Sequence, residues 1–145
     1  MRTLIVVVWL ALPALAGAQE KQIVQIPGAS LGLPFSTAVR VGNMIYLSGQ
    51  IGAPPGSRQV VPGGVGPETR QTLENIKRVL EHARSSMDRV VKCTVFLQDI
   101  ADYAAMNEVY ATFFPKDPPA RSTVAGSGLA LGARVEIECM AVAGI

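Results

Sequence analysis

Apolar and polar positions along the chain follow strand patterns, with two helical patterns between them. Alternation with a period of two and runs of β-prone residues predict six strands, and apolar residues at helical spacing predict two helices. The strands are expected at residues 23–26, 37–41, 44–48, 89–97, 121–125 and 134–142, and the helices at 67–84 and from Asp99 or Asp102 to Pro115. This β-β-β-α-β-α-β-β order predicts a two-layer α/β sandwich, with a mixed six-stranded sheet and both helices on one face.

Local signals support these boundaries. Gly42-Asn43 is typical of a tight hairpin turn, residues 51–67 are rich in glycine and proline, and Pro67 suits the first turn of a helix. The predicted buried stripe of the first helix is Leu73, Ile76, Leu80 and Ala83, and that of the second is Tyr103, Met106, Tyr110 and Phe113.

The last predicted strand has two different faces. Val135, Ile137, Cys139 and Ala141 form an apolar face, whereas Glu136, Glu138, Met140 and Val142 form the opposite one. Two carboxylates beside apolar side chains favour a cleft or a subunit interface, and a plain solvated face is the alternative. The sheet face without helices is therefore expected to be solvated or covered by another subunit.

Residues 1–18 differ from the rest of the chain. Arg2 precedes an apolar segment of about thirteen residues, which is shorter than the roughly twenty that span a bilayer. Ala16-Gly17-Ala18 is a small-x-small cleavage site before Gln19. We interpret residues 1–18 as a cleaved signal peptide and 19–145 as one domain of a secreted or periplasmic protein. An uncleaved anchor or a buried strand is the alternative.

Composition limits the classes of partner and cofactor. The net charge is +2, and removing Arg2 leaves +1 (2 − 1), without a basic cluster that would favour nucleic acid. A single histidine, His82, and no cysteine pair at ligand spacing argue against structural zinc. Cys93 and Cys139 lie in apolar strand patterns, so unpaired core cysteines are favoured over a disulfide, although spatial proximity cannot be read from the sequence.

Several short motifs resemble the RidA/YjgF family of reactive-intermediate deaminases. They are Pro-Ala-Arg-Ser at 119–122, Glu-Ile-Glu at 136–138, the hairpin at 42–51, the strand at 91–99, and the segments 107–110 and 113–114. The resemblance extends from about Ile26 to Val142.

The resemblance implies a fold similar to that of bacillary chorismate mutase. It also implies a homotrimer with clefts between neighbouring subunits. The charge predicts no association with nucleic acid, and no stable membrane association is expected after cleavage of the signal peptide. The deaminase branch hydrolyses 2-imino or enamine acids, such as 2-aminoacrylate, to 2-keto acids and ammonia. It uses no cofactor and no metal.

Residue by residue, the resemblance assigns a site. Arg121 matches the carboxylate anchor, because a guanidinium fork binds a carboxylate through two hydrogen bonds. Glu136 matches the residue that positions the attacking water. The expected substrate-binding residues are Phe35, Ser48, Asn107 and Thr123, the last through its backbone N–H.

Three departures from the family pattern affect this assignment. Phe35 stands where a tyrosine is common, so a hydroxyl is missing, and Thr123 stands where a cysteine is frequent. Residues 126–132 carry no charge and replace the usual Leu-Pro-containing stretch at one rim of the cleft.

Three other functions remain open. A trimer that binds small carboxylates without catalysis needs Arg121 alone, whereas an enzyme needs Arg121 and Glu136 at roughly 4–7 Å across one cleft. A ribonuclease requires a basic groove with stacking aromatics, which the charge does not favour. A chaperone-like protein requires a large exposed apolar patch.

Overall fold

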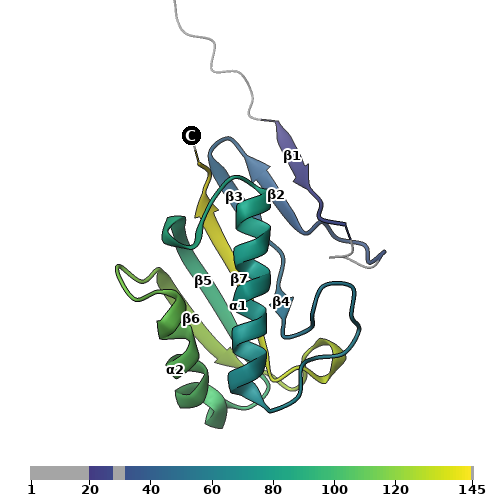
Figure 1. The fold of residues 1–145 in the computed structure, drawn as a ribbon, viewed down its shortest axis with the longest axis vertical. Coiled ribbons are helices and arrows are strands. Elements are labelled where there is room, and N and C mark those ends of the chain that lie inside the picture. Colours follow the sequence, from purple (N-terminus) through teal and green to yellow (C-terminus); the bar gives the residue numbers. More distant parts are fainter. Residues whose placement is uncertain (1–19, 28–31, 145) are drawn as a thin grey trace, which may run out of the picture.

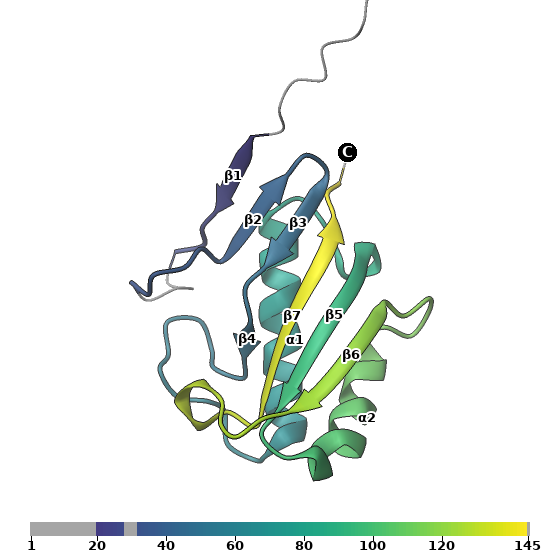
Figure 2. The ribbon, with the colours of Figure 1, turned by 180° about the vertical axis from the view of Figure 1, so that it is seen from behind.

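The computed structural model describes residues 20–27 and 32–144, which form one layer of sheet and one of helices (Figure 1). Both helices cover the same face, and the view from behind shows the other face of the sheet without them (Figure 2). The predicted two-layer α/β architecture is confirmed. The predicted signal peptide lies outside the described residues, so it stays a prediction.

The sheet contains the six predicted strands and one more. The strands are β1 (Lys21–Val24), β2 (Ala38–Val41), β3 (Met44–Leu47), β4 (Gln50–Ile51), β5 (Val90–Leu97), β6 (Ala120–Ala125) and β7 (Val135–Val142). Their order is β1-β2-β3-β7-β5-β6, and β4 pairs with β7 beyond the end of β3. β6 is parallel to β5 because a helix connects them as a crossover. β4 was expected to be loop, since a two-residue strand has no readable period.

Turn chemistry explains the first hairpin. β2 and β3 pair from Ala38↔Leu47 to Val41↔Met44, which leaves Gly42-Asn43 as a two-residue turn. Gly42 has a φ of 59°, a value that glycine adopts without steric cost. The predicted turn is therefore confirmed, with glycine at its first central position.

The helices are α1 (Val65–His82) and α2 (Tyr103–Phe113). The predicted stripe of α1 is buried, and Leu73, Ile76 and Leu80 are fully inaccessible. Before α2, the Asp99 carboxylate accepts a hydrogen bond from the Ala101 N–H at 2.9 Å and caps a short 3₁₀ turn (Ile100–Asp102). None of the described helices is long and apolar enough to cross a membrane.

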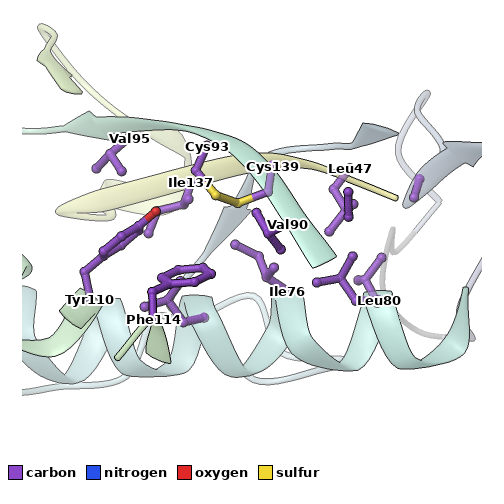
Figure 3. Close-up of a cluster of buried hydrophobic side chains, with 14 of the residues drawn as sticks. Leu47, Ile76, Leu80, Val90, Cys93, Val95, Tyr110, Phe114, Ile137 and Cys139 are labelled. Atoms are coloured by element: carbon purple, nitrogen blue, oxygen red, sulfur yellow. A yellow bond between two sulfur atoms is a disulfide. The ribbon is translucent and has the colours of Figure 1, made fainter. Parts of the chain in front are cut away.

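The core lies between the sheet and the helices, and it contains a disulfide (Figure 3). Cys93 in β5 lies directly opposite Cys139 in β7, with the Cα atoms 4.1 Å apart, and the two sulfur atoms are bonded. Both cysteines are buried, as predicted. The preference for unpaired cysteines was wrong, because strand register decides which residues face each other and the sequence does not reveal it.

The second helix corrects another prediction. Met106 and Tyr110 are buried, but Tyr103 is 42% exposed and does not belong to the core. Tyr103 is the first residue of α2, and its hydroxyl contacts Arg121 of β6, an edge strand of the sheet. Spacing alone assigned Tyr103 to the buried stripe, because helical periodicity does not show where the sheet under a helix ends.

Candidate functional site

A cavity of about 400 Å³ opens at the edge of β4, where the sheet layer ends. It is bounded by the loop before β2, the loop after β4, α1 and the loop before β7; its apolar lining includes Phe35, Ile51, Val79 and Leu131. Cavities of this size are typical of small-molecule sites. Of the predicted site residues, Phe35 and Glu136 line this cavity.

Strand register directs the Glu136 side chain to the sheet face opposite the helices. Glu136 lies beside Ile51 of β4 and Phe96 of β5, and the next residue, Ile137, is fully buried under the helices. A Cβ atom at Gly49 would collide with the Glu136 carboxylate. The carboxylate therefore lies directly over the backbone at the bend between β3 and β4.

The environment of Glu136 changes its acidity. Burial disfavours the charged form, and the negative charge of Glu138 on the same strand face adds to the effect, so the pKa of the Glu136 carboxyl is raised above its ordinary value. A carboxylate with a raised pKa is better matched to proton transfer near neutral pH than an ordinary surface carboxylate.

Ser48 supports this region from outside the cavity lining. Its hydroxyl donates a hydrogen bond to the Ser36 carbonyl at 2.7 Å, and its N–H donates to the Thr37 carbonyl at 3.1 Å. Ser48 thus fixes the segment that carries Phe35, a residue that lines the cavity and is 46% exposed. We call Phe35, Ser48 and Glu136 the glutamate half-site.

The loop before β7 forms one rim of the cavity through Ala130 and Leu131. Its far end is held at Arg134, whose N–H donates to Glu68 at 2.8 Å and whose guanidinium makes a salt bridge to Asp102 at 2.8 Å. Leu131 has a φ of 57°, unusual for a residue with a side chain, and is 54% exposed. The uncharged loop noted in the sequence therefore presents an apolar side chain at the cavity mouth.

Arg121 lies elsewhere, on β6 against α2. Its guanidinium donates a hydrogen bond to the Tyr103 hydroxyl at 3.2 Å and lies 4.6 Å from the centre of the Tyr110 ring. Hydrogen bonds with Asn107 and Arg121 lower the pKa of the Tyr103 hydroxyl. We call Tyr103, Asn107, Tyr110, Arg121 and Thr123 the arginine half-site.

Two buried hydroxyls complete the arginine half-site. The Tyr110 hydroxyl and the Thr123 Oγ1 are buried and have no hydrogen-bond partner among the described residues. Burial raises the pKa of Tyr110 to about 12, against the opposing effect of the Arg121 charge. The Tyr110 ring therefore contacts Arg121 as a neutral aromatic surface, which attracts a guanidinium.

The two half-sites do not meet within one chain. Arg121 is in register with Cys93, which pairs with Cys139, and Glu136 lies three residues further along β7. The Cα atoms of Arg121 and Glu136 are two strands apart across the sheet and three residues apart along the strand direction. These two displacements together correspond to about 14 Å. The side chains also lie on opposite faces, since Arg121 contacts α2 and Glu136 points away from the helices. The 4–7 Å convergence expected of an enzyme is not found inside one subunit.

The sequence did not reveal Tyr103 and Tyr110 as neighbours of Arg121; Tyr110 is buried in the core as predicted, and Tyr103 is not. A signal was present, because Tyr103, Asn107 and Tyr110 have i, i+4, i+7 spacing and share one helix face. Among the described residues, no three His, Cys, Asp or Glu side chains form a group that could hold a metal ion.

Comparisons with known proteins cover nearly the whole described domain. A family model described as Endoribonuclease L-PSP matches residues 29–143. A mouse protein named 2-iminobutanoate/2-iminopropanoate deaminase is 46% identical over 116 residues, which cover 80% of this chain and 85% of the mouse protein.

Solved structures agree with this similarity. The yeast protein YEO7 is 40% identical, covers 86% of this chain and 100% of its own, and has a TM-score of 0.82. The structure of E. coli TdcF with bound serine is 34% identical, covers 85% of this chain and 99% of its own, and has a TM-score of 0.77.

Proposed function

Because the chain belongs to the family of the Endoribonuclease L-PSP model, which is the RidA/YjgF family, we propose that it hydrolyses reactive 2-imino and enamine acids to 2-keto acids and ammonia. The observation that carries the proposal is the half-buried Glu136 carboxylate, with a raised pKa, in an otherwise largely apolar cavity of about 400 Å³. The name of the mouse relative supports the substrate class.

The chemistry requires two protein groups. Arg121 binds the substrate carboxylate through its guanidinium fork. Glu136 accepts a proton from a water molecule as the water oxygen bonds to the imine carbon, and it returns this proton to the nitrogen. The hydroxyl proton of the resulting carbinolamine is then transferred to the nitrogen, the carbon–nitrogen bond breaks, ammonia leaves, and the carbonyl of the 2-keto acid forms.

The separation of the half-sites leads us to propose a trimer with shared sites. The arginine half-site of one subunit closes the cavity of its neighbour, so that Arg121 and Glu136 meet across the interface. Support comes from β6, an edge strand whose Val124 is 48% exposed, and from Tyr46 and Met140 on the open sheet face, 43% and 39% exposed. Such apolar side chains on an open face favour cover by another chain.

The direct test follows the decay of freshly generated 2-aminoacrylate and of larger 2-imino acids, with semicarbazide trapping the surviving imine. Residues 19–145, which include all the described residues, are compared with Arg121→Ala, Arg121→Lys and Arg70→Ala. We expect the wild type and the Arg70→Ala control to accelerate hydrolysis, and Arg121→Ala to lose the acceleration. Arg121→Lys should retain little, because a lysine cannot provide the two-pronged contact.

The non-catalytic carboxylate-binding trimer is the competing function. It predicts that no imine decays faster, while 2-keto acids still bind in an Arg121-dependent manner. The description of the family model also makes RNA a necessary control substrate. We expect no cleavage of single-stranded RNA, since the net charge of +1 that remains without Arg2 does not favour a polyanion.

A further inference from the structure

Two arginine side chains line the cavity that contains Glu136. Arg58 comes from the loop after β4 and Arg78 from α1, and both residues are exposed. Neither guanidinium has a hydrogen bond or an ion pair with a described residue, in contrast to Arg134, which pairs with Asp102. Two guanidinium groups on one largely apolar cavity provide donors suited to an anionic ligand.

The loop that carries Arg58 is held in place by several hydrogen bonds. The Val61 N–H donates to the Gly52 carbonyl at 2.8 Å and closes the loop, and the Ser57 N–H donates to the Pro54 carbonyl at 2.9 Å. Asn75 of α1 donates from its side-chain amide to the carbonyls of Ile51 at 3.1 Å and Ala53 at 2.8 Å. The loop is thus fastened to the helix that carries Arg78, which lowers the entropic cost of binding a ligand there.

Glu136 is not the partner of these arginines. A guanidinium close to a carboxylate lowers its pKa, yet burial and Glu138 raise the pKa of Glu136, and no arginine contributes to the shift. The cavity therefore keeps its carboxylate separate from its two guanidinium groups. Its volume of about 400 Å³ equals that of about thirteen liquid waters at about 30 Å³ each, so a three-carbon imino acid fills only part of it.

We propose that Arg58 and Arg78 form a subsite for a second anionic group, and that the preferred substrates are 2-imino acids with a distal carboxylate. This inference rests on the proposed function. Arg121 of the neighbouring subunit holds the carboxylate next to the imine, Glu136 acts at the imine carbon, and the arginine pair holds the far end. The reaction is unchanged: water adds to the carbon–nitrogen double bond, ammonia leaves, and the distal carboxylate takes no part.

The test compares two imines of equal carbon number, generated by an amino-acid oxidase from glutamate and from norvaline. The enzymes are the wild type, the double variant Arg58→Gln/Arg78→Gln, and Arg70→Gln as a control for the loss of an exposed α1 arginine. We expect the double variant to lose about 10- to 100-fold in kcat/KM on the glutamate imine, the range for lost hydrogen bonds to a charged group. On the norvaline imine, and for Arg70→Gln on both substrates, the change should stay below about twofold.

A binding arm separates failure of this inference from failure of the proposed function. Calorimetry measures the dissociation constants of 2-oxoglutarate and 2-oxobutanoate. This measurement does not depend on catalysis. Tighter binding of the dicarboxylate that is lost in the double variant upholds the subsite even if no imine is hydrolysed. Equal affinity for both keto acids overturns the inference. If the double variant loses affinity for both keto acids equally, the inference is also overturned, and the arginine pair would then be a general carboxylate anchor.

Discussion

The glutamate half-site borders a cavity, whereas the arginine half-site lies at the edge of the sheet. Glu136 is half-buried over the backbone of Gly49, and its pKa is raised by burial. Arg121 lies on an edge strand beside Tyr103, which is 42% exposed. Arg121 is only half-buried, and an arginine that water still reaches binds a carboxylate weakly, because water competes for both groups and weakens their attraction. Each half-site therefore lacks what the other provides: one has the half-buried carboxylate for proton transfer, and the other has the guanidinium that we assign to the carboxylate next to the imine.

Mixing two inactive variants tests whether the half-sites combine across subunits, and it has the largest expected effect. Arg121→Ala and Glu136→Gln should each be inactive. The unfractionated mixture from equal co-expression should recover about one quarter of wild-type activity, and hybrids that contain both chains should recover about one third, because every such ring of three has one intact cleft. Two affinity tags isolate hybrids that contain both chains. If such hybrids stay inactive, Arg121 and Glu136 do not act in one shared cleft.

The faces of the strands and the buried stripe of the first helix could be predicted from the sequence. The relative positions of the two half-sites could not. In β7 the alternation of polar and apolar residues placed Glu136 and Ile137 on opposite faces, which is confirmed. In β6 polar and apolar residues do not alternate in the sequence. The strand lies at the sheet edge, where all its residues are exposed or half-buried. The direction of Arg121 depends on its contacts with α2, and these form only in the folded chain.

The disulfide lies in the core between the half-sites, so its removal should affect the stability of the fold rather than one half-site. Cys93→Ala/Cys139→Ala should lower the free energy of unfolding by about 3 kcal/mol, given that the bond closes a long loop. Urea unfolding at fixed protein concentration measures the change. Activity at low temperature should change by less than about twofold. A loss of activity without a lower urea midpoint would contradict this role.

Within the glutamate half-site, Gly49→Ala tests the position of the carboxylate. The new Cβ would collide with the Glu136 side chain and displace it from its place over the backbone. We expect kcat/KM to fall about 100-fold, the scale of a 1 Å misplacement at a reacting centre. Gly66→Ala is the matched control, because the nearest atom to its added Cβ is the Val109 side chain at 3.9 Å. Equal activity of the two variants would show that Glu136 tolerates displacement.

Within the arginine half-site, Tyr110 tests how Arg121 is held. Tyr110→Leu removes the ring that the guanidinium contacts at 4.6 Å, and we expect KM to rise about tenfold with a smaller change in kcat. Tyr110→Phe keeps the ring and removes a hydroxyl without a partner among the described residues, so KM should be unchanged. A rise in KM for Tyr110→Phe would instead assign the binding role to the hydroxyl.

The pH profile gives the smallest effect and separates the half-sites most cleanly. Glu136 must be ionised to accept a proton, so kcat/KM should fall as the pH drops through its raised pKa.

Glu138→Gln removes a negative charge from the same strand face, which favours the Glu136 carboxylate and lowers its pKa. The acidic limb should therefore move to lower pH. It should still lie above that of an ordinary carboxyl, since burial, the larger cause, remains. Glu74→Gln, on the exposed side of α1, is the control and should leave the profile unchanged. An equal shift of the acidic limb in Glu74→Gln would mean that distant exposed charges move it as much as Glu138 does, and the shift could then no longer be assigned to the shared strand face of Glu138 and Glu136.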